Sequence, residues 1–121
     1  MVLVTSNKTK QLLVISYFGS VRLKELQRNR ADLTEQLGRL SPDFRLLADF
    51  SRLESMELDC APELGRMMDL IGQAGVSRVV RVIPDKDKDI GMNILTVFHY
   101  PHRPRVITCG NLAEAARILD L

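Results

Sequence analysis

The residue best placed to do chemistry is Cys60, in the stretch Asp59–Cys60–Ala61–Pro62. Proline suits the first turn of an α-helix, because its missing N–H is not needed there and its φ angle is already helical. We therefore expect Cys60 at the start of a helix, where unpaired N–H groups and the helix dipole favour negative charge. A thiolate, a phosphate or the carboxylate of a partner could use such a place.

The thiol of Cys60 is either a low-pKa nucleophile or a small buried apolar group. Asp59 and Glu63 oppose thiolate formation, and no histidine adjoins in sequence to act as a base. We therefore expect a structural or contact role for Cys60, and helix capping for Asp59. Ser51 and Ser55 are expected to bond local backbone, with a relocated phosphorylation site as the alternative.

Other candidate groups have simpler interpretations. His99, His102 and Cys109 are metal-ligand types, but their spacing matches no known metal site, so we predict no metal. Met67 and Met68 share an apolar helix stripe, which favours a place in the core, although a partner groove would use the same residues.

Three arginines are expected on the strands of a sheet. Arg45, Arg78 and Arg81 could form a basic face for a small anion, but they lack the interleaved aromatic residues of a nucleic-acid surface. Arg81 stands in the middle of a predicted strand, which indicates a sheet face that is incompletely covered.

Composition predicts an ordinary globular chain. The 121 residues fit one domain, residues 1–121, with 45% hydrophobic and 26% charged residues and a net charge of +2. No apolar run approaches the roughly 20 residues of a membrane span. Two cysteines are too few for a disulfide framework, and residues 1–10 do not read as a secretory signal, so we expect a reduced, cytoplasmic setting.

Hydrophobic periodicity predicts the elements that position these side chains. Strands are expected at residues 2–6, 11–18, 44–49, 76–83 and 105–108, and helices at 21–40, 61–74, from Asp87 or Asp89 to about His99, and 111–119. Gly19 is expected to stop the second strand, Gly75 to cap the second helix, and Asn111 with Glu114 to cap the last helix.

This order, ββαβαβαβα, predicts the topology. Right-handed crossovers make the strands from the second onward parallel and leave the first as an antiparallel edge. The fold class is therefore α/β, with one mixed, mostly parallel five-stranded sheet and about four helices.

This order of elements, together with the stretch from residue 44 to residue 65, resembles the STAS domain family of bacterial anti-sigma-factor antagonists over nearly the whole chain. In that family a motif like D-L-S ends a strand, and D-S-S-G-L opens the next helix, with its first serine phosphorylated. Here residues 49–51 read DFS and residues 59–61 read DCA, with Leu64 and Gly65 beyond. Cys60 stands at the position of the phosphorylated serine, and a thiol is no substrate for a serine kinase.

The resemblance implies a non-enzymatic regulatory module that docks a protein, such as an anti-sigma factor or a related regulator, without the usual phosphorylatable serine. We find no sequence motif for catalysis or for a cofactor, and we expect no nucleic-acid partner. The oligomeric state is left open, a dimer included. The expected partner-binding residues are Ser51, Ser55, Asp59, Cys60, Glu63 and Met67. The alternative is a domain that holds a small anionic or lipid-like ligand near the helix N-terminus or the arginine-bearing sheet face.

Overall fold

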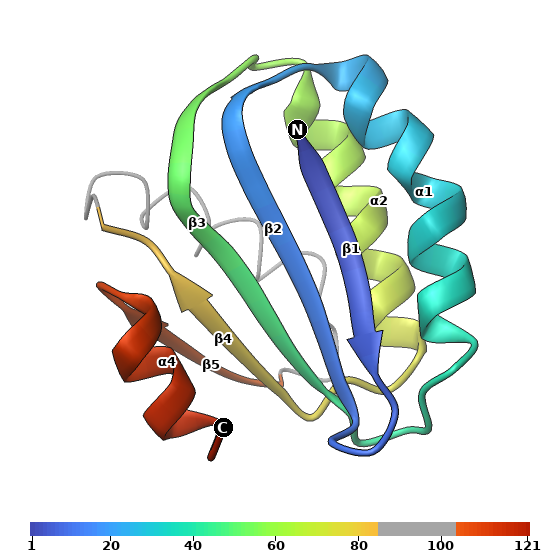
Figure 1. The fold of residues 1–121 in the computed structure, drawn as a ribbon. Helices are drawn as coiled ribbons and strands as arrows, with labels where there is room; N and C mark the ends of the chain where they lie inside the picture. Colours follow the sequence, from blue (N-terminus) through green and yellow to red (C-terminus); the bar gives the residue numbers. More distant parts are fainter. Residues whose placement is uncertain (85–103) are drawn as a thin grey trace.

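The chain forms a five-stranded sheet with helices on both faces, in a computed structural model that describes residues 1–84 and 104–121 (Figure 1). Its elements are β1 (Val2–Asn7), β2 (Leu12–Val21), α1 (Leu23–Leu37), β3 (Arg45–Met56), α2 (Cys60–Gln73), β4 (Arg78–Val82), β5 (Arg105–Cys109) and α4 (Leu112–Ile118). The sheet order is β1-β2-β3-β4-β5, with β1 antiparallel to β2 and the remaining pairs parallel. The predicted α/β class and mixed, mostly parallel sheet are confirmed.

The helices broadly follow the predicted segments. The first helix is shorter than expected, because α1 occupies residues 23–37 rather than 21–40. The predicted helix that ends near His99 lies outside the described residues. No helix within residues 1–84 and 104–121 is long and apolar enough to cross a bilayer.

The second strand continues through Gly19, so the prediction that this glycine stops the strand is wrong. Gly19 adopts a φ of +61°, and the pairing of β2 with β3 shifts its register on either side of it. Glycine takes this left-handed conformation without a Cβ clash, so the strand absorbs an irregularity and runs on to Val21.

The third strand is longer than predicted, ending at Met56 instead of Asp49. Its first part, residues 45–49, lies between β2 and β4, and its later residues pair with β2. Because the residues of this later part are mostly polar, the sequence pattern predicted a turn there instead of a strand. Along it, half-buried and exposed side chains largely alternate, as expected where a strand has one face on the core.

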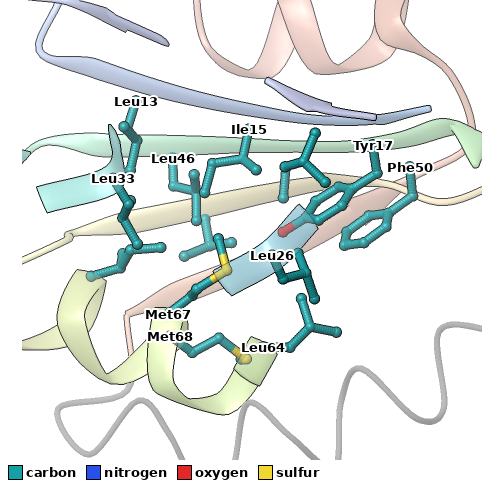
Figure 2. Close-up of a cluster of buried hydrophobic side chains, with 14 of the residues drawn as sticks. Leu13, Ile15, Tyr17, Leu26, Leu33, Leu46, Phe50, Leu64, Met67 and Met68 are labelled. Atoms are coloured by element: carbon teal, nitrogen blue, oxygen red, sulfur yellow. The ribbon is translucent and has the colours of Figure 1, made fainter. Parts of the chain in front are cut away.

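The main hydrophobic core lies between the sheet and the pair α1 and α2. Leu64, Met67 and Met68 project from α2 toward sheet residues (Figure 2). Tyr17 and Phe50 stack in this core with ring centroids 4.5 Å apart. Met67 is 1% exposed, which confirms the core placement of the methionine stripe; burial of such a side chain stabilises the fold by about 1.5–3 kcal/mol.

A smaller core lies on the opposite face of the sheet, under α4. Val80 and Val82 of β4 pack there against Ala115 and Leu119, whereas Val79 belongs to the main core. Neighbouring residues of one strand therefore face opposite sides, as strand geometry requires.

Two predicted helix ends are confirmed. Gly75 follows α2 with a φ of +95°, the left-handed conformation that terminates helices. At the start of α4, the Asn111 side chain accepts a hydrogen bond from the Glu114 N–H at 2.9 Å, and it donates one to the Glu114 carboxylate at 3.2 Å.

Candidate functional site

The candidate site is the junction between β3 and α2, at the carboxyl ends of the parallel strands β2 and β3 (Figure 1). Residues 57–59 connect Met56 to Cys60, the first residue of α2. The expected position of Cys60 at a helix N-terminus is therefore confirmed.

The six residues predicted to bind a partner divide by exposure. Ser55 and Asp59 are exposed and Ser51 is half-buried. Cys60 and Glu63 are 0% exposed and Met67 is 1% exposed, so these three side chains are not at the surface. Direct contact with a partner in this conformation is open to Ser51, Ser55 and Asp59.

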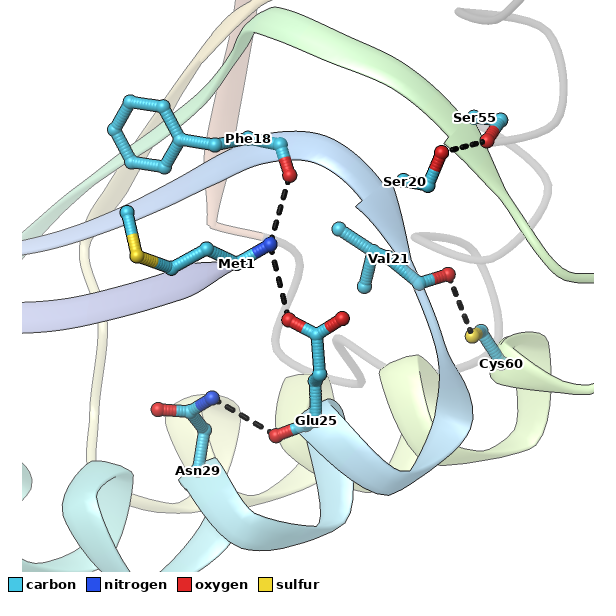
Figure 3. A network of polar contacts seen from close by, with 8 residues as sticks. All are labelled: Met1, Phe18, Ser20, Val21, Glu25, Asn29, Ser55 and Cys60. Atoms are coloured by element: carbon cyan, nitrogen blue, oxygen red, sulfur yellow. Dashed lines mark hydrogen bonds and ion pairs between the residues drawn. The ribbon is translucent and has the colours of Figure 1, made fainter.

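Cys60 is buried under the end of β2, with its Sγ 3.8 Å from the Val21 carbonyl oxygen (Figure 3). Burial raises the pKa of the thiol above its ordinary value, and the negative charges of Asp59 and Glu57 raise it further. A raised pKa and a buried sulfur both oppose a nucleophilic role. The geometry therefore agrees with the structural role expected for this cysteine.

The predicted capping by Asp59 is wrong. Asp59 is the N-cap residue of α2, but its side chain makes no capping hydrogen bond and its backbone is already helical, with φ −70° and ψ −6°. A capping side chain normally projects from an extended residue. Here the Cys60 N–H donates to the Glu57 carbonyl at 3.0 Å, and the Ala61 N–H to the Leu58 carbonyl at 3.2 Å. Because Pro62 has no N–H, the first three helical positions leave no donor for an anion.

Glu63 lies between α1 and α2 as the centre of an ion-pair group. Its carboxylate accepts hydrogen bonds from Arg30 Nε at 2.9 Å and Nη2 at 2.5 Å, and from Arg66 Nη1 at 3.0 Å. The hydrogen bonds from Arg30, opposed by desolvation and aided by Arg66, lower the pKa of the carboxyl below its ordinary value. Glu63 therefore joins two helices.

The prediction that Ser55 bonds local backbone is wrong, because its hydroxyl bonds a side chain on the neighbouring strand, and the contact of Ser51 is made by its backbone N–H rather than by its hydroxyl. The Ser51 N–H donates to the Asp49 side chain at 2.9 Å, and Ser55 donates its hydroxyl to the Ser20 hydroxyl at 2.9 Å across the β2–β3 pair (Figure 3).

The three arginines expected to form a basic sheet face donate hydrogen bonds to other groups of this chain. Arg45 donates to the Leu119 carbonyl at 2.5 Å and Arg78 to the Ile118 carbonyl at 3.4 Å, both at the end of α4, where the helix dipole favours cations. Arg81 is 3% exposed and donates to the Thr108 hydroxyl at 2.9 Å. The prediction of an uncovered sheet face at Arg81 is wrong, because the side chain is buried.

A cavity of about 30 Å³ lies between the sheet and α2, with a mainly apolar lining that also includes Tyr17 and Arg81. A single water occupies roughly 10–15 Å³ on this scale, so the space suits about two waters. It is too small for a lipid-like ligand in this conformation.

Of the three residues considered as metal ligands, His99 and His102 lie outside the described residues. The thiol of Cys109 is buried. In residues 1–84 and 104–121, no three side chains of metal-binding type gather at one place.

The sequence interpretation missed Leu58. This leucine is 94% exposed in the connection between β3 and α2. Its signal was an apolar residue with Glu57 before it and Asp59 after it, at a point where no helical or strand periodicity assigns it to the core.

Neither a protein-family model nor a curated protein matches the sequence. Solved structures do match. The unphosphorylated anti-sigma factor antagonist SpoIIAA aligns over 100% of both chains at 18% identity, with a TM-score of 0.64. SpoIIAA in its phosphorylated form, a Bacillus cell fate determinant, gives 18% identity and a TM-score of 0.62 over 98% of this chain and 99% of that one.

An uncharacterized Shewanella loihica protein with a SpoIIAA-like fold gives a TM-score of 0.72 at 14% identity, over 98% of this chain and 92% of its own. Identities this low show architecture rather than activity. The alignments nevertheless cover 98% or more of this chain, which has a STAS-like fold of the SpoIIAA type.

Proposed function

We propose that this chain is a non-enzymatic regulatory module that docks another protein. Its docking surface is the set of exposed residues between Ser51 and Met68. The observation that carries the proposal is the match of the whole chain to an anti-sigma factor antagonist, SpoIIAA. The β3–α2 junction that the resemblance assigns to partner binding is exposed at Ser55 and Asp59.

The partner that we propose is an anti-sigma factor or a related regulator, met in the cytoplasm. Regulation differs from that of family members with a serine at the start of this helix. The motif resemblance puts Cys60 at the serine's position, and the side chain of Cys60 is buried. We therefore expect docking to be controlled by something other than phosphorylation at residue 60.

Two observations weigh against the small-ligand alternative. The first three positions of α2 offer no free N–H to an anion, since two groups are bonded and Pro62 has none. The cavity beside Arg81 measures about 30 Å³, less than a lipid-like molecule needs.

Affinity capture tests the docking surface. The full chain is immobilised and exposed to an extract of its source cells, beside a variant that carries Ser55→Arg and Asp59→Arg. Both substituted side chains are exposed, so we expect the variant to fold. A matched control, Asp32→Arg with Thr34→Arg, places the same changes on the exposed face of α1.

We expect the wild type and the α1 control to retain the same regulator and the junction variant to lose it. Equal recovery of every protein by all three would rule out this surface. Thermal unfolding of each variant separates loss of docking from loss of fold.

A further inference from the structure

A small apolar patch lies on the docking surface. Leu58 is the most exposed large hydrophobic residue in the described part of the chain, at 94%. Ala61 and Pro62, three and four positions later in the first turn of α2, are also exposed. We call these three residues the Leu58 patch. Most isolated surface leucines need no explanation, but this one lies on the surface already proposed for docking.

The backbone under the Leu58 patch is held in place. The Glu57 N–H donates to the Val21 carbonyl at 3.3 Å, and the Cys60 N–H donates to the Glu57 carbonyl at 3.0 Å. The Cys60 side chain is buried immediately after the connection. The leucine is therefore presented on an ordered turn, and a rigid anchor loses less entropy when it binds.

The border of the patch is acidic. Glu54, Glu57 and Asp59 are exposed; two exposed arginines adjoin the same segment, Arg22 next to the Val21 carbonyl that accepts from the Glu57 N–H, and Arg52 over the Phe18 ring. Among the described residues, none of the three carboxylates makes an ion pair. The nearest basic residue along the helix, Arg66, bonds to Glu63. An approaching partner therefore meets an apolar centre beside three carboxylates that make no ion pair among the described residues and that outnumber the two arginines.

We propose that Leu58 anchors the docking partner by entering an apolar pocket bordered by lysine and arginine side chains on that protein. This inference rests on the proposed docking function and specifies its chemistry. Large side chains that fill a pocket at the centre of an interface contribute most of the affinity. The carboxylates of Glu54, Glu57 and Asp59 complement a basic border and raise the rate of association.

Site-specific cross-linking identifies the contacting protein. The photoreactive amino acid p-benzoylphenylalanine replaces Leu58 in the full chain, expressed in the source cells. The same replacement at Leu3, 46% exposed on β1, serves as the control. Mass spectrometry of the cross-linked peptide then locates the contact, which we expect in an apolar segment flanked by lysine or arginine.

The contribution of Leu58 to affinity is measured by titrating this chain with the purified partner that cross-linking has identified. We expect Leu58→Ser to raise the Kd about tenfold or more, and Leu3→Ser to leave it unchanged. Removal of the border charges, by Glu54→Gln, Glu57→Gln and Asp59→Asn together, should slow association and remove most of its salt dependence. All of these positions are exposed or half-exposed, and circular dichroism confirms the fold of each variant.

The outcomes distinguish the two proposals. If Leu58→Ser binds the same protein as tightly as the wild type, the anchor is refuted while the docking function stands. If the rate of association depends neither on salt concentration nor on the carboxylates of Glu54, Glu57 and Asp59, the proposed basic border of the pocket is refuted. A cross-link from position 58 to a second copy of this chain would refute the partner class. If the wild type retains no protein in the affinity capture and neither photoreactive variant is cross-linked to one, the docking function itself fails.

Discussion

Replacement of Glu63 by glutamine should destabilise the protein, although the sequence places this residue on a binding surface. Glutamine keeps the shape of the side chain and removes its charge. The carboxylate is fully buried and accepts hydrogen bonds from Arg30 and Arg66, whose side chains are 45% and 59% exposed. The variant therefore tests whether Glu63 joins α1 to α2.

The size of the effect follows from these exposures. Loss of one member of a fully buried ion pair costs about 3–5 kcal/mol, because the other charge remains buried. Here both arginines reach water, and one hydrogen bond to a charged group is worth about 1.5–3 kcal/mol, so we expect a loss of about 2 kcal/mol. An unfolding entropy of about 2.1 cal/mol/K per residue, applied to 121 residues, converts this to a decrease in Tm of about 8 °C.

The pH dependence gives a second test of the same group. The folded-state pKa of Glu63 lies below its ordinary value of 4.5, chiefly because Arg30 donates hydrogen bonds to the carboxylate. A lowered folded pKa gives stability that is present above about pH 4.5 and lost as the pH falls through the folded value. The stability difference between wild type and Glu63→Gln should therefore shrink in acid.

Urea unfolding at pH 7 and at a series of acidic pH values measures both quantities. The control is Glu35→Gln, which removes an exposed carboxylate 3.9 Å from Arg39 and should change the free energy of unfolding by less than about 0.5 kcal/mol. A Glu63→Gln loss no larger than that of the control, or one that is the same at pH 3 and pH 7, would contradict this reasoning.

Three further predictions concern local features. The thiol of Cys60 should react with iodoacetamide at pH 7 on the order of ten times more slowly than cysteine in a short peptide, since it is buried and its pKa is raised; mass spectrometry gives the rate, and equal rates would refute this. Gly75→Ala should cost about 1–2 kcal/mol of folding free energy in thermal unfolding, because φ is +95°, whereas Gly110→Ala, with no atom within 4 Å of the added Cβ, serves as a near-neutral control. Asn111→Ala should cost about 1 kcal/mol through loss of the α4 cap, and Asn111→Asp should restore most of it; if both variants unfold like the wild type, the cap contributes nothing.

Much of the fold could be predicted because the sequence pattern and the local chemistry agree. The apolar stripes of α1 and α2 have helical spacing, Gly75 and Asn111 end or begin helices as their types favour, and the valines of β4 alternate between two cores. The long β3 strand was the main failure. Its polar half has the composition of a turn, and its strand structure depends on pairing with β2, which is distant in sequence.

The candidate site was predicted in position but not in detail. The Asp59–Pro62 stretch correctly indicates a helix start, because proline restricts its own backbone conformation. Which of the site residues are exposed could not be predicted from the sequence. The burial of Glu63, for example, depends on its hydrogen bonds with Arg30, 33 residues earlier. Asp59 has a residue type that favours capping, but the turn from Glu57 satisfies the helix N–H groups through backbone carbonyls instead.

The unequal lengths of β3 and β4 divide the sheet into zones of different local stability. Residues 45–49 of β3 lie between two strands, while its last residues, on the way to the Leu58 patch, pair among the described strands with β2. Backbone with fewer neighbours opens at a lower free energy than the centre of a sheet, so amide hydrogen exchange should proceed there without global unfolding. The strand end that leads to the Leu58 patch should therefore open more readily than residues 45–49, whereas the hydrogen bonds of Glu57 and Cys60 keep the turn that carries the patch ordered.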